Sequence, residues 1–255
     1  MPRLKRLRIF AGPNGSGKTT LYYYLTNKRK VFKNYCFINA DEITKKLKES
    51  LDLKVFPIKI SRHDLSDFLK TPAFPPKLTK PLSEYLNVQG YVLTLKDKNL
   101  SRIDYISASI AEFLRKKILS NSSSSFAFET VLSHKSKLVE ISNAKKCGYK
   151  IYLYVVSTSH PDINKKRVQM REKMGGHSVP LEKIKKRYHR CLNNIYDAML
   201  LADRAFFFDN SGKKHSFIAQ KFVQKEYKGL FLESNLPTPW FNKYILDKIL
   251  KKNKF

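Results

Sequence analysis

The sequence predicts an α/β fold in which a parallel sheet of about five strands is flanked by helices. Two observations predict it. A glycine-rich segment, GPNGSGKT at residues 12–19, lies between a short apolar run and a helical pattern. In addition, short apolar runs alternate with amphipathic segments along most of the chain, and strands that alternate with helices form parallel sheets covered on both faces. With 255 residues, the chain is long enough to build one large core.

The expected strands are five apolar runs. They are LRIFAG (7–12), NYCFINA (34–40), FAFET (126–130), YKIYLYVV (149–156) and AFFF (205–208). Helices are expected between them, because the intervening segments repeat apolar residues at helical spacing. The clearest are DEITKKLKES (41–50), the segment that begins at Ser101, SKLVEISNAKKCG (136–148), PDINKKRVQMREKM (161–174) and the segment from Leu181 to Met199.

Two parts of the chain depart from this alternation. Residues 51–100 hold five of the 11 prolines and a hairpin pattern around NVQGYVLTL (87–95), so we expect an insertion on the core. Residues 213–255 are very basic and have a helical pattern, with Trp240 and Phe241 as docking residues. We therefore expect a single domain over residues 1–255 that carries an insertion and a helical C-terminal extension.

The charge of the chain is strongly positive. The 50 basic residues outnumber the 21 acidic ones and give a formal net charge of +29. A field of this sign attracts polyanions and speeds the arrival of anionic substrates. It fits either a lysine-rich solvated surface or a nucleic-acid partner. We favour the first interpretation, with nucleic acid as the less favoured partner.

Cysteine usage and hydropathy indicate the cytoplasm. Cys36, Cys147 and Cys191 are an odd number of cysteines in apolar contexts, which predicts buried free thiols in a reducing compartment. The longest apolar run, IYLYVV (151–156), is too short to cross a bilayer. We therefore expect a cytoplasmic protein that does not interact with a membrane.

The glycine-rich segment matches the phosphate-binding pattern G-x-x-x-x-G-K-(S/T) of P-loop NTPases. Its glycines allow backbone N–H groups to surround a phosphate at the positive end of a helix. Lys18 is expected to reach the β- and γ-phosphates, and the Thr19 hydroxyl to coordinate Mg²⁺. ATP and Mg²⁺ are thus the predicted cofactors. The candidate nucleotide-binding residues are Gly12, Pro13, Asn14, Gly15, Ser16, Gly17, Lys18, Thr19 and Thr20.

Asp41 follows the second expected strand directly, at the edge where open α/β sheets bind ligands. Its carboxylate is placed to accept the proton of an attacking hydroxyl, which a kinase requires and a switch GTPase does not. Asp is also a preferred N-cap residue, and Asp41 precedes a helical pattern. From position alone, a catalytic base and a helix cap are equally consistent with the sequence.

Two further groups of polar residues flank the loop. Glu129 and Thr130 end the third expected strand. A carboxylate at this position binds either the waters around Mg²⁺ or a hydroxyl of the substrate. Arg167 and Arg171 are four residues apart and so share one helix face, from which guanidinium groups can neutralise charge on a transferring phosphoryl. The pair Gly175–Gly176 that follows this helix predicts a lid that bends.

The order of these motifs resembles that of the zeta-toxin-like P-loop kinases. The segments that carry the resemblance are IFAGPNGSGKTT, INADEI, FAFETVLS, GYKIYLYVVST, RVQMREKMGGHSVP and ADRAFFFDNSG. The matching motifs cover residues 8–40 and 105–212, and leave out the insertion and the C-terminal extension. The resemblance implies a bacterial cytoplasmic kinase with a parallel core, and an inhibitory antitoxin protein as a partner.

The resemblance also implies roles for individual residues. Asp41 would be the base, Lys18 and Thr19 would hold ATP and Mg²⁺, and the arginines at 167 and 171 would stabilise the transferring phosphoryl. The DNSG segment at 209–212 would lie near the adenine. The best understood members phosphorylate UDP-N-acetylglucosamine, which they grip with a Gly-Thr-Gly-Arg type segment. Here TVLS (130–133) stands in that place without an arginine, so the acceptor stays open.

The sequence therefore predicts an ATP- and Mg²⁺-dependent kinase that transfers the γ-phosphoryl to a hydroxyl of a small anionic acceptor. UDP-N-acetylglucosamine is the first acceptor to test. The alternative is a nucleic-acid-binding NTPase or a kinase that acts on polynucleotide ends, as the +29 charge suggests. The expected partners are ATP, a small-molecule acceptor and an acidic antitoxin protein.

Overall fold

The computed structural model describes residues 4–32, 36–72, 78–121, 124–174, 180–224, 227–233 and 238–252. The chain divides into two compact units. The first combines Met1–Tyr35 with Ala127–Phe255, and the second is Cys36–Phe126. The 51–100 insertion expected from the sequence lies inside the second unit. The single-domain organisation stays a prediction, because the division describes packing and not independent folding.

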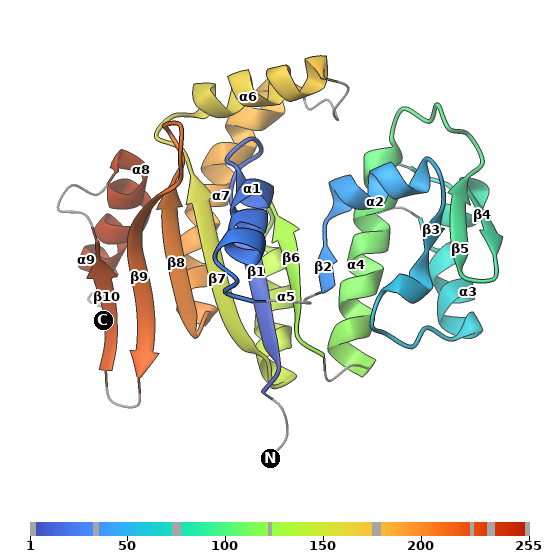
Figure 1. Ribbon diagram of the computed structural model, residues 1–255, viewed down its shortest axis with the longest axis horizontal. Coiled ribbons are helices and arrows are strands. Elements are labelled where there is room, and N and C mark those ends of the chain that lie inside the picture. The colour runs from blue at the N-terminus through green and yellow to red at the C-terminus, as the bar shows by residue number, and fades with distance from the viewer. Residues whose placement is uncertain are drawn as a thin grey trace. The chain divides into compact units, whose positions relative to one another are not determined.

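The first unit is built on a mostly parallel sheet (Figure 1). Its neighbouring strands follow the order β10-β9-β8-β7-β1-β6. The strands are β1 (Arg6–Ala11), β6 (Phe126–Thr130), β7 (Lys150–Ser157), β8 (Arg204–Asp209), β9 (Ser216–Gln224) and β10 (Tyr227–Leu232). β1 pairs with β7 and β7 with β8 in parallel, whereas β8–β9 and β9–β10 are antiparallel. The parallel core was predicted from the alternation of strands and helices.

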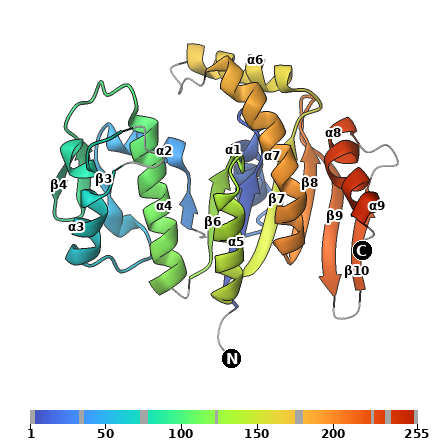
Figure 2. The same cartoon turned by 180° about the vertical axis from the view of Figure 1, so that it is seen from behind.

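Helices cover both faces of this sheet. Figures 1 and 2 show α1 on one face and α5 and α7 on the other. The helical elements of the first unit are α1 (Lys18–Tyr23), η1 (Tyr24–Lys28), α5 (Ser136–Lys146), α6 (Pro161–Lys173), α7 (Leu181–Leu201), α8 (Pro239–Phe241), η4 (Asn242–Leu246) and α9 (Asp247–Lys252). Within the described residues, none of the helices combines the length and the apolar character that a membrane span needs.

The core of the first unit lies between the central strands and these helices. Leu7, Ile9 and Phe10 of β1 are fully buried, as expected for a strand covered on both faces. The Phe10 ring stacks on Tyr154 of β7 at 4.7 Å between centroids, and Tyr154 stacks on Phe206 of β8 at 5.0 Å. This aromatic row crosses three parallel strands beneath the loop that leaves β1.

The second unit contains the insertion and its flanks. A small antiparallel sheet in the order β3-β5-β4 packs with helices in this unit. The elements are β2 (Cys36–Ile38), α2 (Ala40–Leu47), β3 (Leu51–Asp52), η2 (Leu53–Val55), α3 (Arg62–Lys70), η3 (Leu82–Glu84), β4 (Leu86–Gln89), β5 (Val92–Leu95) and α4 (Ile103–Asn121). β4 and β5 confirm the predicted hairpin. α2 and α4 are joined by the Thr44 hydroxyl, which donates to the Ser107 hydroxyl at 2.7 Å.

The C-terminal extension is helical only in its second half. The expectation of a helix throughout 213–255 is wrong for β9 and β10, and helices occur at Pro239–Lys252. β9 is rich in residues that favour strands, such as Phe217, Ile218 and Val223, and by pairing with β8 it covers an edge that would otherwise be open. The extension as a whole had a basic, helical pattern, but pairing of β9 with the sheet overrides that local preference.

The three cysteines are free thiols, but they are not all buried. Cys191 in α7 is fully buried, and burial raises the pKa of its thiol to about 12. Cys36 is half-buried, and Cys147 is exposed because it caps the C-terminal end of α5. The prediction of three buried thiols is therefore confirmed for Cys191 and wrong for Cys147.

Candidate active site

The loop between β1 and α1 has the backbone of a phosphate-binding loop. Gly17, at the N-cap of α1, has a φ of 93°, and Gly15 has a φ of 72°, a left-handed conformation in which side chains other than glycine are strained. At Gly12, an added Cβ atom would lie only 2.0 Å from the carbonyl oxygen of Val156 in β7. The glycines are therefore required by the shape of the loop and by its close approach to the neighbouring strand.

Three side chains from distant parts of the sequence hold the carbonyl oxygens of this loop. Each donates one hydrogen bond: Asn164 to Asn14 at 2.7 Å, Asn210 to Ser16 at 2.9 Å, and His215 to Gly17 at 3.1 Å. Asn164 is fully buried in α6, and Asn210 follows β8 directly. Because these bonds engage carbonyl oxygens that would repel an anion, they favour a loop that presents N–H groups to a phosphate.

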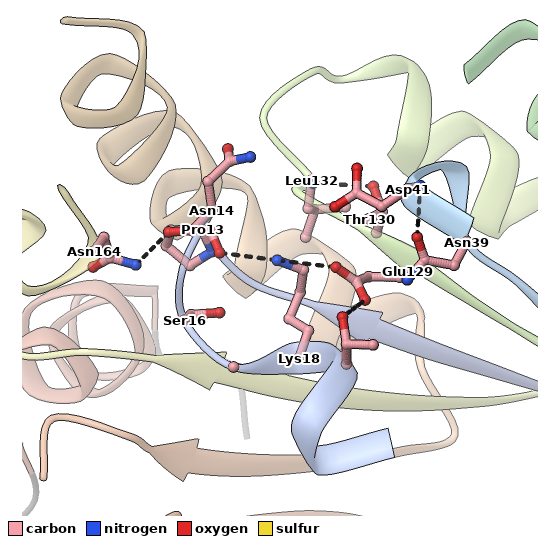
Figure 3. Close-up of polar contacts among 12 residues, drawn as sticks. Pro13, Asn14, Ser16, Lys18, Asn39, Asp41, Glu129, Thr130, Leu132 and Asn164 are labelled. Atoms are coloured by element: carbon pink, nitrogen blue, oxygen red, sulfur yellow. Dashed lines mark hydrogen bonds and ion pairs between the residues drawn. The ribbon is translucent and has the colours of Figure 1, made fainter. Parts of the chain in front are cut away.

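Lys18, Thr19 and Glu129 form a compact polar cluster at this loop. Figure 3 shows Lys18 and Glu129 side by side. The Thr19 hydroxyl donates to Oε2 of Glu129 at 2.6 Å, and Nζ of Lys18 lies 3.5 Å from Oε1 of the same carboxylate. Nζ of Lys18 also donates to the carbonyl oxygen of Pro13 at 2.9 Å, inside the loop. The structure thus brings Glu129, at the end of β6, against the loop residues that the sequence singled out.

The cluster fits an Mg²⁺ ion that is bound together with a nucleotide. Oγ of Ser16 and Oδ1 of Asn14 are buried in the loop without a hydrogen-bond partner, so this part of the loop has polar atoms left to bind a ligand. No group of three or more His, Cys, Asp or Glu side chains suited to a metal occurs in the described part of the chain. Mg²⁺ commonly takes few protein ligands and completes its shell with phosphate oxygens and waters, which agrees with this donor set.

Arg167 and Arg171 lie on α6 and have different surroundings. Nη2 of Arg167 donates to the carbonyl oxygen of Gly212 at 3.1 Å, and its Nη1 is buried without a hydrogen-bond partner. Arg171, one turn further along α6, is exposed. The structure therefore places Arg167 against the segment that follows β8, and the role of Arg171 stays a prediction. The Gly175–Gly176 pair, expected to form a lid, lies outside the described residues.

Asp41 lies in the second unit, in the first turn of α2. The cap of this helix is Asn39, whose side-chain oxygen accepts from the backbone N–H of Asp41 at 2.8 Å (Figure 3). The interpretation of Asp41 as the helix cap is therefore wrong. The side chain of Asp41 is exposed. The signal for the true cap was present in the sequence, because Asn directly before a helical pattern is a preferred N-cap.

Thr130 contributes to the turn that follows β6. Its hydroxyl accepts from the backbone N–H of Leu132 at 3.1 Å, and its carbonyl oxygen accepts from the N–H of Gly12 at 3.3 Å. Leu132 has a φ of 56°, and its carbonyl oxygen accepts from the Asn194 side chain at 2.9 Å. Thr130 thus connects the end of β6 to the start of the phosphate-binding loop. Its predicted contact with an acceptor stays a prediction.

His215 is a site residue that the sequence did not indicate. It lies 198 positions from Gly17 in the sequence, and no local pattern marks it. Burial lowers the pKa of its imidazole, the hydrogen bond to Gly17 raises it, and the nearby Arg167 lowers it further, with a net decrease. A neutral imidazole whose Nε2–H donates to Gly17 is therefore favoured at neutral pH.

The fold of this chain is similar to those of several solved structures. No protein-family model and no curated protein matches the sequence. A chain of the AvrRxo1-ORF1:AvrRxo1-ORF2 complex is similar, with a TM-score of 0.57 at 12% identity over 91% of this chain and 62% of that one. The same complex with ATP gives a TM-score of 0.57 at 13% identity over 96% of this chain and 63% of the other.

A third similar structure comes from the PezAT chromosomal toxin–antitoxin system of Streptococcus pneumoniae, with a TM-score of 0.50 at 14% identity over 86% of this chain and 72% of that one. The chain shares with these structures a P-loop NTPase-type α/β fold, a mostly parallel sheet flanked by helices. The resemblance in the order of motifs predicted this fold. The chain spans less than two thirds of the AvrRxo1 chains that it matches.

In this fold, several of the polar residues around the P-loop come from the ends of strands. Glu129 is the second-last residue of β6, Asn210 follows β8, and Thr158, which bonds to Asn164, follows β7. Open parallel sheets bind ligands at the carboxyl ends of their strands. The position of the cluster in the fold therefore agrees with its composition.

Proposed function

We propose that the protein is an ATP- and Mg²⁺-dependent kinase of the zeta-toxin type, which transfers the γ-phosphoryl of ATP to a hydroxyl of a small anionic acceptor. The observation that carries the proposal is the cluster of Lys18, Thr19 and Glu129 at a glycine loop in this fold. Similar solved structures support it, because one of them was obtained with ATP and another belongs to a toxin–antitoxin system.

In this proposal the loop residues 12–20 bind the triphosphate of ATP. Nζ of Lys18 leaves the Pro13 carbonyl and contacts the β- and γ-phosphates, while Glu129 keeps the ammonium group oriented. The Thr19 hydroxyl and the Glu129 carboxylate are the residues that would hold Mg²⁺, Thr19 directly and Glu129 through the surrounding waters. When bound, Mg²⁺ would neutralise charge on the phosphate oxygens.

The phosphoryl transfer needs a base for the acceptor and positive charge for the phosphoryl. The acceptor oxygen forms a bond to the γ-phosphorus, the bond to the bridging oxygen of ADP breaks, and the hydroxyl proton passes to Asp41. Two observations support Asp41: it lies in the first turn of α2, three residues after the end of β2, and Asn39 fills the role of the helix cap. Arg167 and Arg171 supply guanidinium groups to the developing charge.

The acceptor is proposed to be anionic because the chain carries a formal net charge of +29, which raises the local concentration of anions. Glu129 had two proposed roles, in the magnesium shell or on a substrate hydroxyl. Its hydrogen bond from Thr19 favours the first. UDP-N-acetylglucosamine is the first acceptor to test, although the TVLS segment at 130–133 lacks an arginine with which to grip a diphosphate.

A protein partner is also proposed. AvrRxo1-ORF1 was solved as a complex with AvrRxo1-ORF2, and PezAT is a toxin–antitoxin system. An antitoxin for this chain should be acidic, because charge complementarity speeds association with a surface of net charge +29.

The experiment that tests the proposed function supplies ATP radiolabelled at the γ-phosphoryl, together with Mg²⁺ and a panel of sugar nucleotides, nucleosides and polynucleotide ends. The proposal predicts label on a small anionic acceptor and none with Lys18→Ala. Label on polynucleotide ends, with binding that weakens steeply as salt rises, would instead support the alternative kinase. Release of free phosphate alone, whatever acceptor is present, would contradict both kinases.

A further inference from the structure

The strand end next to the P-loop is tied to the C-terminal segment by one indole. Trp240 in α8 donates its Nε1–H to Oδ2 of Asp209, the last residue of β8, at 2.8 Å. Trp240 is 2% exposed and Asp209 is 8% exposed, so this hydrogen bond is shielded from solvent. A buried carboxylate requires donors to offset its desolvation, and the indole supplies one of them.

The other oxygen of this carboxylate shapes the turn that follows β8. Oδ1 of Asp209 accepts from the backbone N–H of Ser211 at 2.8 Å, which fixes the turn at residues 209–211. Within that turn, the side chain of Asn210 donates to the Ser16 carbonyl of the P-loop. Asp209 is therefore held between the indole of Trp240 on one side and the backbone that presents Asn210 on the other.

The segment 209–215 contacts the nucleotide site at further points. The Gly212 carbonyl accepts from Arg167, and His215 donates to the Gly17 carbonyl. The Ser211 hydroxyl accepts from the backbone N–H of Ser159 at 2.8 Å, beyond the end of β7. A change in the position of Asp209 would therefore affect the P-loop and Arg167 together.

The C-terminal segment that carries Trp240 is anchored to α7. The Phe241 ring packs edge-on against Phe207 of β8 at 5.0 Å between centroids. The Tyr244 hydroxyl and Nδ1 of His189 share a hydrogen bond at 2.9 Å, and Nζ of Lys248 donates to the carbonyl oxygen of Asn193 at 2.8 Å. The Phe241 contact, directly next to Trp240, places the indole at the end of β8. The hydrogen bonds of Tyr244 and Lys248 anchor the later part of the segment.

We infer that Trp240 is a positioning residue for the nucleotide site. Its indole N–H holds Asp209, and Asp209 holds the turn whose Asn210 fixes the P-loop. The C-terminal segment 238–252 is thus a structural support of the site, although it lies outside the motifs that the sequence resemblance covers. The effect on ATP rests on the proposed function, whereas the effect on the turn does not.

The test compares Trp240→Phe with Tyr244→Phe as a matched control. Trp240→Phe keeps an aromatic ring and removes the N–H that Asp209 accepts, and Tyr244→Phe removes one hydrogen bond from the same segment, the one shared with His189 of α7. In the nucleotide-free protein, amide hydrogen exchange at 209–215 should be about three- to tenfold faster in Trp240→Phe and unchanged in Tyr244→Phe. Unchanged exchange in Trp240→Phe would overturn the inference.

Calorimetric titration with Mg-ATP provides a second readout. Trp240→Phe should weaken binding about three- to tenfold, while Tyr244→Phe binds as the parent does. In an Asp209→Ala background, which removes both acceptor oxygens, Trp240→Phe should add no further loss, because the indole acts through that carboxylate. Equal losses in both backgrounds would show that Trp240 acts elsewhere and would overturn the inference.

The two claims fail in different ways. If the parent protein binds no Mg-ATP, the proposed function fails, and the exchange data alone decide whether Trp240 positions the turn. If the parent binds Mg-ATP and the exchange at 209–215 does not respond to Trp240→Phe, the positioning role fails and the kinase proposal stands.

The chain has 1 tryptophan, so the fluorescence emission of Trp240 gives a further check. The emission is expected to change when Mg-ATP binds. Constant emission on binding would contradict the coupling between Trp240 and the nucleotide site.

Discussion

At the scale of single residues, the site depends on one carboxylate shared by two P-loop side chains. Glu129 accepts from Thr19 and lies beside Lys18, so it contacts both proposed ligands of the Mg-nucleotide. The sequence predicted this residue from its position at the end of an apolar strand. The resemblance placed the DNSG segment, which contains Asn210, near the adenine, but it did not predict the hydrogen bond of Asn210 to Ser16. The sequence could not predict His215, which reaches the loop from 198 positions away and has no local pattern.

Glu129→Gln tests the role of this carboxylate. The amide can still accept from Thr19, but it lacks the negative charge that orients Lys18 and the waters around Mg²⁺. The Mg²⁺ concentration that gives half-maximal activity should rise about 10- to 100-fold, as for other residues that orient metal ligands. The measurement is a Mg²⁺ titration of phosphoryl transfer at fixed ATP.

The control for Glu129→Gln is Glu140→Gln. Glu140 lies in α5 and pairs with Lys137 at 2.8 Å, so the variant removes the same charge outside the P-loop cluster. It should leave the Mg²⁺ titration unchanged. Coincident titrations for Glu129→Gln and the parent would show that Glu129 has no part in the magnesium shell.

His215 gives a prediction on pH. Because the pKa of His215 is lowered in the folded protein from its usual 6.5, the unfolded chain takes up the proton first as the pH falls. This group therefore destabilises the fold progressively below about pH 6.5 and has no such effect well above it. His215→Gln, which does not titrate, should lose less thermal stability than the parent between neutral and mildly acidic pH. Equal losses of thermal stability in His215→Gln and in the parent would contradict the lowered pKa of His215.

At the scale of elements, the strand β9 connects the C-terminal extension to α7. Lys221 in β9 is buried, and its Nζ donates to the carbonyl oxygens of Met199 at 2.8 Å and Ala202 at 2.6 Å. Carbonyl oxygens at the end of a helix have no partner within the helix, so the ammonium group caps α7. The basic segment 213–255 was expected to be helical here, because local patterns do not register pairing with β8.

Lys221→Met tests this capping role. The substitution keeps the aliphatic stem and removes the donors, so buried carbonyl oxygens of α7 lose their partner. The expected loss is about 2 kcal/mol in the free energy of unfolding, as for hydrogen bonds to charged groups. Lys214→Met, at an exposed position before β9, is the control and should stay near the parent value. Equal unfolding midpoints for both variants would mean that Lys221 does not cap the helix.

At the scale of the whole molecule, charge and topology have separate consequences. The alternation of strands and helices predicted the parallel core, and the P-loop motif predicted its ligand-binding edge. The extent of the second unit could not be predicted from patterns of proline and glycine alone, because the residues that pack together in it are distant in sequence, as Thr44 and Ser107 are. The formal charge of +29 concerns partners and substrates and not the fold.

The charge leads to a prediction on salt. If the positive field gathers anionic nucleotide, the association rate for Mg-ATP should fall about tenfold or more from low to high ionic strength, with a smaller change in the dissociation rate. Stopped-flow binding at several salt concentrations measures both rates. An association rate that is independent of salt would show that the charge serves another partner.

The central claim is that the chain transfers the γ-phosphoryl of ATP to a hydroxyl, with Asp41 as the base. The most direct measurement is phosphorus NMR of the protein with Mg-ATP and the acceptor that takes up label, for the parent and for Asp41→Asn. The parent should give a new phosphate-ester resonance as ADP forms. Asp41→Asn should bind Mg-ATP normally and form that resonance at least about 100-fold more slowly. Formation at the parental rate in Asp41→Asn would contradict the account.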